Sequence, residues 1–143
     1  MGIGESSKGV VTPGVSVAEG GQTGEILAGG ESLFRAVAAR GNYLGQDRMD
    51  MQFAAKEISR FMSKPEEQDW RSAKRLARYL KDNKRMVIEY KFQKLPEKVM
   101  VWSDTDFAGC KRTRRSTSGG VVMFGSHCIK TYSQMQETIA LSS

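Results

Sequence analysis

The chain has 143 residues, of which 39% are hydrophobic and 27% are charged, and its formal net charge is +6 at pH 7. The sequence contains no run of eighteen apolar residues and no N-terminal apolar stretch of signal-peptide length, which argues against a membrane protein. We therefore expect an intracellular soluble protein whose positive charge favours an anionic partner.

Residues 1–30 contain nine glycines and few large hydrophobic residues. Such a segment buries too little apolar surface to offset the entropy that it loses on ordering. We predict a flexible, glycine-rich lead-in over this range. It holds one lysine and three glutamates, so the basic excess belongs to the rest of the chain.

From residue 31 the apolar side chains recur at helical spacing and predict the first two helices. The first covers residues 33–44, with Gly41 as a weak point, because glycine lowers helix stability. The second covers residues 51–62, with Asp50 as a plausible N-cap.

A third helix is predicted from Pro65, which suits a first helical turn, to Asn83. Its expected buried stripe consists of Trp70, Ala73, Leu76, Ala77 and Leu80. Much of the remaining surface is basic. Such a surface is more often solvated, and contact with nucleic-acid phosphates is the alternative. The candidate cations are Lys74, Arg75 and Arg78.

After Asn83 the apolar residues alternate with a period of two, which predicts short strands. The four predicted strands are 86–90, 98–102, 120–124 and 128–132. Turn-length connections separate them and favour an antiparallel meander. The predicted fold class is α+β, with a helical N-terminal half followed by a short antiparallel β-meander.

The cysteines Cys110 and Cys128 are far apart in the sequence, and His127 is the single histidine. No Cys-x-x-Cys pair is present, so the sequence offers no ligand set for zinc. Two reduced thiols are the favoured interpretation.

Asp104 ends the apolar run Val99-Met-Val-Trp-Ser-Asp104, and Asp106 follows two residues later. An acid at the end of a strand either caps a turn or holds a metal ion. Considered without any relative, the turn-capping interpretation is favoured.

A basic turn follows these acids, and three hydroxyl residues come next. The cations are Lys111, Arg112, Arg114 and Arg115, and the hydroxyl residues are Ser116, Thr117 and Ser118. Cations and hydroxyls suit contacts with the phosphates and 2′-hydroxyls of a hybrid duplex. A solvated hairpin loop is the equally weighted alternative.

The ordered set of motifs resembles the Pol polyproteins of copia-type LTR retrotransposons. Ser103-Asp-x-Asp-Phe-Ala-Gly109, Arg115-Ser-Thr-Ser-Gly119 and Ala140-Leu-Ser-Ser143 resemble their ribonuclease H segment. Arg60-Phe-Met-x-x-Pro65 and Trp70-x-x-Ala73 resemble the region between the reverse-transcriptase palm and ribonuclease H. The resemblance implies a reverse-transcriptase tail over 31–84 and an incomplete, truncated ribonuclease-H-like domain over 85–143.

The resemblance also implies a chemistry. Ribonuclease H hydrolyses the RNA strand of RNA–DNA hybrids with two Mg²⁺ ions held by convergent carboxylates. By resemblance Asp104 is the first catalytic and metal-bridging acid, and Asp106 is the nearest second carboxylate. The family's second catalytic acid follows the Ala-Leu-Ser-Ser run, so we expect this chain alone to be inactive.

The partners that the resemblance implies are an RNA–DNA hybrid or other nucleic acid and the remainder of the Pol polyprotein, with Mg²⁺ as cofactor of the complete parent. The implied location is a cytoplasmic particle or the nucleus, with no membrane. The alternative function is a non-catalytic, basic nucleic-acid-binding module from a decayed or domesticated element.

Overall fold

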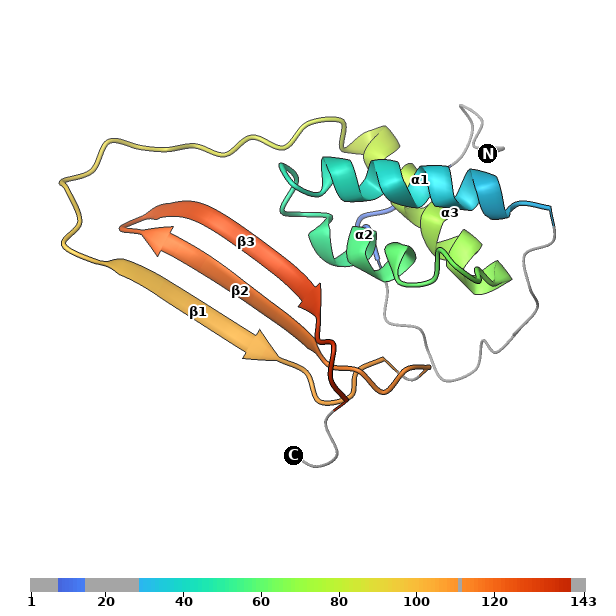
Figure 1. The fold of residues 1–143 in the computed structure, drawn as a ribbon. Coiled ribbons are helices and arrows are strands. Elements are labelled where there is room, and N and C mark those ends of the chain that lie inside the picture. The colour runs from blue at the N-terminus through green and yellow to red at the C-terminus, as the bar shows by residue number, and fades with distance from the viewer. Residues whose placement is uncertain (1–7, 15–28, 111, 140–143) are drawn as a thin grey trace. The chain divides into compact units, whose positions relative to one another are not determined.

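A computed structural model describes residues 8–14, 29–110 and 112–139 (Figure 1). The elements in chain order are α1 (Glu31–Leu44), α2 (Gln52–Ser59), α3 (Glu67–Asp82), β1 (Val99–Thr105), β2 (Thr117–Phe124) and β3 (His127–Met135). This order confirms the predicted α+β class with helices first. The chain divides between Met86 and Val87 into two compact parts, the helical unit and the sheet unit. Within the described ranges every helix is too short or too polar to cross a bilayer.

The helical unit is built around one apolar cluster formed by all three helices. Its buried members are Phe34, Ala38, Met51, Ala54, Ala55, Ile58, Ala73 and Leu76. Many of these side chains are small, which lets the helices approach closely. Gly41 shows the same requirement, since a Cβ atom there would lie 3.3 Å from Cδ1 of Ile58 and 3.5 Å from Cδ2 of Leu76. The predicted weak point is therefore a close-packing position, and α1 continues through it to Leu44.

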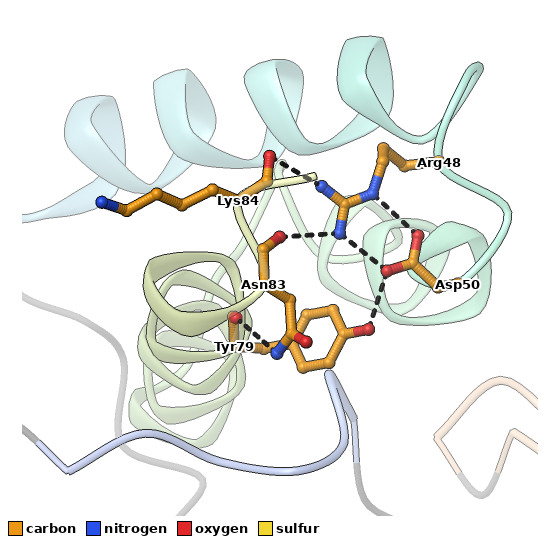
Figure 2. A network of polar contacts seen from close by, with 5 residues as sticks. All are labelled: Arg48, Asp50, Tyr79, Asn83 and Lys84. Carbon is orange, nitrogen blue, oxygen red and sulfur yellow. Dashed lines mark hydrogen bonds and ion pairs between the residues drawn. The ribbon is translucent and has the colours of Figure 1, made fainter. Parts of the chain in front are cut away.

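Helix α2 is shorter than predicted, and the prediction of Asp50 as its N-cap is wrong. The N-cap is Met51, without a side-chain hydrogen bond, and the helix ends at Ser59. Asp50 is engaged elsewhere (Figure 2). Its Oδ1 accepts a hydrogen bond from Nε of Arg48 at 2.9 Å, and its Oδ2 accepts from Nη2 of Arg48 and from the Tyr79 hydroxyl, each at 2.7 Å.

This polar network also closes the C-terminal end of α3. Nη2 of Arg48 donates to the carbonyl of Asn83 at 2.9 Å, which satisfies an acceptor that has no partner within the helix (Figure 2). The hydrogen bond from Arg48 holds the pKa of Asp50 below its ordinary value. The hydrogen bond to the Asp50 carboxylate raises the pKa of Tyr79. The network thus ties the α1–α2 connection to the end of α3.

Helix α3 begins at Glu67, two residues after Pro65, because Glu66 is its N-cap. The buried carboxylate of Asp69 accepts the backbone N–H of Glu66 at 2.9 Å and so satisfies a free donor of the first turn. Ala73 and Leu76 are buried as predicted, and Trp70 and Leu80 pack against the core. Tyr79 is also buried, and the apolar pattern had not indicated it.

The sheet unit is a three-stranded antiparallel meander in the order β1-β2-β3 (Figure 1). The register places Val99 opposite Phe124 and Thr105 opposite Ser118. The two-residue turn between β2 and β3 includes Gly125 at φ +61°, a conformation that glycine adopts readily. Three of the four predicted strands are therefore present, and each is longer than predicted.

The predicted strand 86–90 is wrong, since the described segment 83–98 holds neither helix nor strand. Its second part is tied to the sheet unit by side chains. The Tyr90 hydroxyl donates to the Cys128 carbonyl at 3.0 Å, and Nε2 of Gln93 donates to the Phe124 carbonyl at 2.9 Å. An alternating pattern gives a segment strand propensity but does not provide a neighbouring strand. Val87 accordingly stays largely exposed.

Candidate nucleic-acid interface

Asp104 lies near the end of β1, directly opposite Gly119 of β2. It is exposed, and its Oδ1 accepts the backbone N–H of Thr105 at 2.8 Å. Among the described residues its Oδ2 has no hydrogen-bond partner. A carboxylate oxygen in this position suits a cation ligand or a polar contact with a substrate.

Asp106, the residue after β1, closes a loop over 106–117. Its N–H donates to the carbonyl of Thr117 at 3.1 Å, and its Oδ1 accepts the Thr117 N–H. Its Oδ2 lies against Gly109, where an added Cβ would be only 2.0 Å away. The Asp106 carboxylate is thus turned into the loop and does not join Asp104 as a second open ligand.

The two acids fit a magnesium site only in part. Asp104 provides one open carboxylate oxygen, whereas Asp106 is held by the Thr117 amide. In the described part of the chain, no three His, Cys, Asp or Glu side chains gather in a way that could hold a metal ion. The described residues do not by themselves make the convergent carboxylate set that two Mg²⁺ ions require.

The interior of the 106–117 loop is held by hydrogen bonds. The Ser116 side chain is buried, and its Oγ accepts the Ala108 N–H at 3.0 Å. The Cys110 N–H donates to the Arg115 carbonyl at 3.1 Å, and the Arg114 N–H donates to the Cys110 carbonyl at 2.7 Å. Ser116 and Thr117, predicted to touch nucleic acid, are both buried. We assign the Ser116 hydroxyl to the support of the loop.

The cations of the loop have different placements. Arg112 and Arg114 are exposed, Arg115 is half-buried, and Lys111 lies outside the described residues. Arg114 has a left-handed backbone with φ of 56°. The hydrogen-bonded interior of the loop fixes the backbone from which these arginines project.

Next to Asp104, polar side chains connect the ends of the three strands. Oγ of Ser118 lies 3.1 Å from Oγ1 of Thr105 and accepts from Nε2 of Gln136 at 2.9 Å. Ser118 was predicted as a contact residue, whereas Thr105 and Gln136 were not. Their signal in the sequence is a polar residue at a strand end, which is too common to single them out.

The basic side of α3 is partly occupied by the chain itself. Nη2 of Arg75 donates to Oγ1 of Thr12 at 2.9 Å, and Nε of Arg78 donates to the Lys8 carbonyl at 2.7 Å. Lys74 is exposed, with its Nζ 5.6 Å from the centre of the Trp70 ring. Of the three predicted cations, two therefore hold the segment 8–14 against α3.

The predicted flexible lead-in is thus described only in part. Residues 8–14 lie on the helical unit, where a Cβ at Gly14 would be 3.5 Å from the Ala54 Cβ. The rest of the predicted lead-in, 1–7 and 15–28, lies outside the described residues. The arginines donate to the Thr12 hydroxyl and to the backbone carbonyls of Thr12 and Lys8, and such acceptors leave no hydrophobic pattern in the sequence.

Comparison with known proteins identifies relatives of this chain, although no protein-family model and no solved structure matches it significantly. Secreted RxLR effector protein 161 of Plasmopara viticola is 35% identical over 96 residues, covering 67% of each chain. An uncharacterized mitochondrial protein of Arabidopsis thaliana is 33% identical over 113 residues, or 78% of this chain and 46% of that protein. The retrovirus-related Pol polyprotein from transposon RE1 of Arabidopsis thaliana is 32% identical over 110 residues, which are 77% of this chain and 7% of the polyprotein. The chain thus belongs to the family that contains the Plasmopara protein, and it is related to retrotransposon Pol polyproteins.

Proposed function

We propose that this chain is a nucleic-acid-binding segment of a copia-type Pol polyprotein. In this proposal the helical unit is the tail of the reverse-transcriptase region, and the sheet unit is the beginning of a ribonuclease-H-like domain. The observation that carries the proposal is the open carboxylate of Asp104, placed at a strand end next to the arginine-bearing loop 106–117. The relationship to the RE1 polyprotein supports it.

The preferred ligand is an RNA–DNA hybrid. Arginine guanidinium groups bind phosphate oxygens through two parallel hydrogen bonds, and Arg112 and Arg114 are exposed on the loop. The described loop residues are held by hydrogen bonds, and a backbone that is held before binding loses less entropy when it binds. Phosphate contacts position a duplex without reading its bases, so the chain should bind hybrids with little sequence preference.

Asp104 has the role of a metal ligand in the complete polyprotein. Mg²⁺ bound there would stabilise the charge that develops as a phosphodiester is hydrolysed. The further carboxylates must come from other segments of the polyprotein, because Asp106 is engaged by Thr117. The chain on its own should therefore bind a hybrid without cleaving it.

The binding test is a salt titration of affinity for a fluorescently labelled RNA–DNA hybrid. The triple variant Arg112→Ala, Arg114→Ala, Arg115→Ala should lower the slope of log affinity against log salt by about two or more. A charge-matched control changes Lys84, Lys91 and Lys94 to Ala, since all three are exposed and lie outside the loop. Equal slopes for the loop variant and the unchanged chain would show that the loop is only solvated.

The cleavage test uses the same hybrid with Mg²⁺ present. The unchanged chain should leave the RNA strand intact, and Asp104→Asn should keep its affinity or raise it slightly through the loss of a negative charge. Mg²⁺-dependent cleavage that disappears in Asp104→Asn would overturn the proposed inactivity and place a complete active site in this chain.

A second function is a non-catalytic nucleic-acid-binding module. The observation that favours it is the engagement of Asp106 in the loop, which leaves Asp104 as the one open acid of this pair. The two functions differ in the full polyprotein. If Asp104→Asn in the full polyprotein abolishes hybrid cleavage but keeps binding, Asp104 is catalytic. If the unchanged polyprotein binds the hybrid but never cleaves it, the non-catalytic module is the correct function.

A further inference from the structure

Arg75 and Arg78 of α3 hold the segment 8–14, and both were predicted to bind phosphate. Nε of Arg75 donates to the Thr12 carbonyl at 3.2 Å, and its Nη2 donates to the Thr12 hydroxyl at 2.9 Å. Nε of Arg78 donates to the Lys8 carbonyl at 2.7 Å. The segment therefore occupies donors through which α3 would contact a nucleic acid.

Thr12 binds Arg75 in the way that a phosphate would. The Nε–H and one Nη–H of a guanidinium point in the same direction, and this pair of donors matches two oxygens of a phosphate. Here the two oxygens are the carbonyl and the hydroxyl of Thr12. A phosphate cannot use the same pair of donors while Thr12 holds it, so the two ligands exclude each other.

The spacing of the arginines favours a polyanion over a single anion. Arg71, Arg75 and Arg78 follow one another at intervals of four and three residues, so they lie along one face of α3. With a rise of about 1.5 Å per residue, this row is about 10.5 Å long. One carboxylate occupies one guanidinium, whereas successive phosphates of a nucleic-acid strand can occupy the row. Asp82, one turn beyond Arg78, carries the opposite charge and ends the row.

The attachment of the segment 8–14 is weak enough to be reversible. None of its seven residues is buried, and Val11 is 92% exposed. Three exposed hydrogen bonds, each worth about 1 kcal/mol, have to offset the entropy of ordering the segment. The segment still competes well with a dilute ligand, because it belongs to the same chain and acts at a high effective concentration.

We propose that the segment 8–14 masks a second phosphate-binding site, formed on α3 by Arg71, Arg75 and Arg78, and that a nucleic-acid strand binds there when the segment is displaced. The inference rests on the proposed function for the class of ligand, but it concerns the helical unit and not the loop 106–117. Because the segment and the strand exclude each other, release of the segment raises the affinity of α3 for phosphates, and a strand bound to α3 releases the segment.

The first test weakens the attachment in the full chain and measures affinity for the labelled RNA–DNA hybrid. The released variant carries Gly9→Leu and Thr12→Val. A Cβ atom at residue 9 would overlap the carboxylate of Asp82, and the second change removes the hydroxyl that accepts from Arg75. Affinity at low salt should rise about tenfold. The slope of log affinity against log salt should become steeper by about two, because two more arginines contact phosphates.

The gain must come from the masked arginines. Changing Arg75 and Arg78 to Ala should remove it from the released variant, but should lower affinity less than about threefold in a chain with the original segment. Val11→Ala is the matched control within the segment, since this exposed side chain should leave affinity unchanged. The same gain should appear in the triple variant of the loop 106–117, so this inference and the proposed function can fail separately.

Amide chemical shifts of residues 8–14 report whether the segment has left α3. If these shifts change in the released variant while affinity and slope do not rise, the proposal is overturned. If the segment stays bound in that variant, excess hybrid at low salt decides with the unchanged chain. The hybrid should then move the Gly9 and Thr12 amide shifts toward those of the variant in which Arg75 and Arg78 are Ala. Shifts that stay constant at the highest hybrid concentration would overturn the proposal.

Discussion

The helical unit and the sheet unit are stabilised by different interactions. The helical unit buries a contiguous apolar cluster centred on Phe34, Met51 and Ile58. In the described part of the sheet unit, the buried residues are small or polar and belong to the 106–117 loop or its edge, and every residue of β1 is exposed. Apolar burial contributes about 25 cal/mol per Å², so the first unit has the larger source of stability. The second leaves the side chains of β1 exposed.

The largest expected effect comes from Phe34→Ala. Phe34 is completely buried, and truncating such an aromatic core residue costs about 3–5 kcal/mol of unfolding free energy. The matched variant Val101→Ala removes an exposed side chain and should cost less than about 0.5 kcal/mol. Amide resonances of each unit, followed through urea unfolding, measure both effects. We expect the sheet unit to keep its stability in Phe34→Ala, and simultaneous loss of both units would contradict this expectation.

Asp50→Asn should have the next largest effect, within the helical unit alone. It removes the charge that binds Arg48 and so weakens the hydrogen bond from Arg48 to the Asn83 carbonyl at the end of α3. The free energy of unfolding should fall by about 1–3 kcal/mol. The measurement is urea unfolding monitored by helical circular dichroism. Asp47→Asn is the control, because it removes the same charge nearby without a place in this network. Equal losses in the two variants would show that net charge, and not the network, matters.

The same network predicts a pH dependence. The pKa of Asp50 is lowered in the folded state. Its contribution to the free energy of unfolding is therefore complete above the ordinary pKa of 3.8 and is lost as pH falls through the folded pKa. The pKa of Tyr79 is raised, so its contribution is complete below the ordinary value of 10.0 and is lost as pH rises through the folded pKa. In Asp50→Asn the free energy of unfolding should fall less steeply as the pH is lowered. An unchanged acid limb in this variant would contradict the assignment.

The smallest expected effect concerns the segment 8–14. Changing Arg75 and Arg78 to Ala should cost about 1 kcal/mol or less, because these hydrogen bonds are exposed. Hydrogen exchange of the Thr12 amide should nevertheless become faster, while the α3 core amides keep their protection. Lys74→Ala is the control, since Lys74 contacts Trp70 instead. Unchanged exchange at Thr12 in the double variant would show that the arginines do not hold the segment.

The two units also differ in how much of their structure could be predicted from the sequence. Helix α3 was predicted well because its apolar residues follow a helical period over many turns. The role of Asp50 was not, because a nearby arginine and Tyr79 compete for its carboxylate, and that competition depends on the packing of distant helices. The strand 86–90 failed because strand propensity does not determine pairing.

The candidate interface could be predicted from the sequence only in part. The strand containing Asp104 and the basic loop follow from local pattern, together with the resemblance to Pol polyproteins. The inward position of Ser116 does not, because it depends on a hydrogen bond to Ala108, eight residues earlier in the loop. The attachment of residues 8–14 could not be predicted for a related reason, since two of the three arginine hydrogen bonds are accepted by backbone carbonyls, which any sequence supplies.

We propose that the sheet unit, and not the helical unit, contacts the nucleic acid. Titration of an isotope-labelled chain with an RNA–DNA hybrid, followed by amide chemical shifts, tests it most directly. We expect the largest changes at Asp104, Thr105 and 112–118, with small changes at Lys74 and none at core residues such as Ile58. Changes confined to α3, with the loop and the end of β1 unaffected, would contradict this proposal.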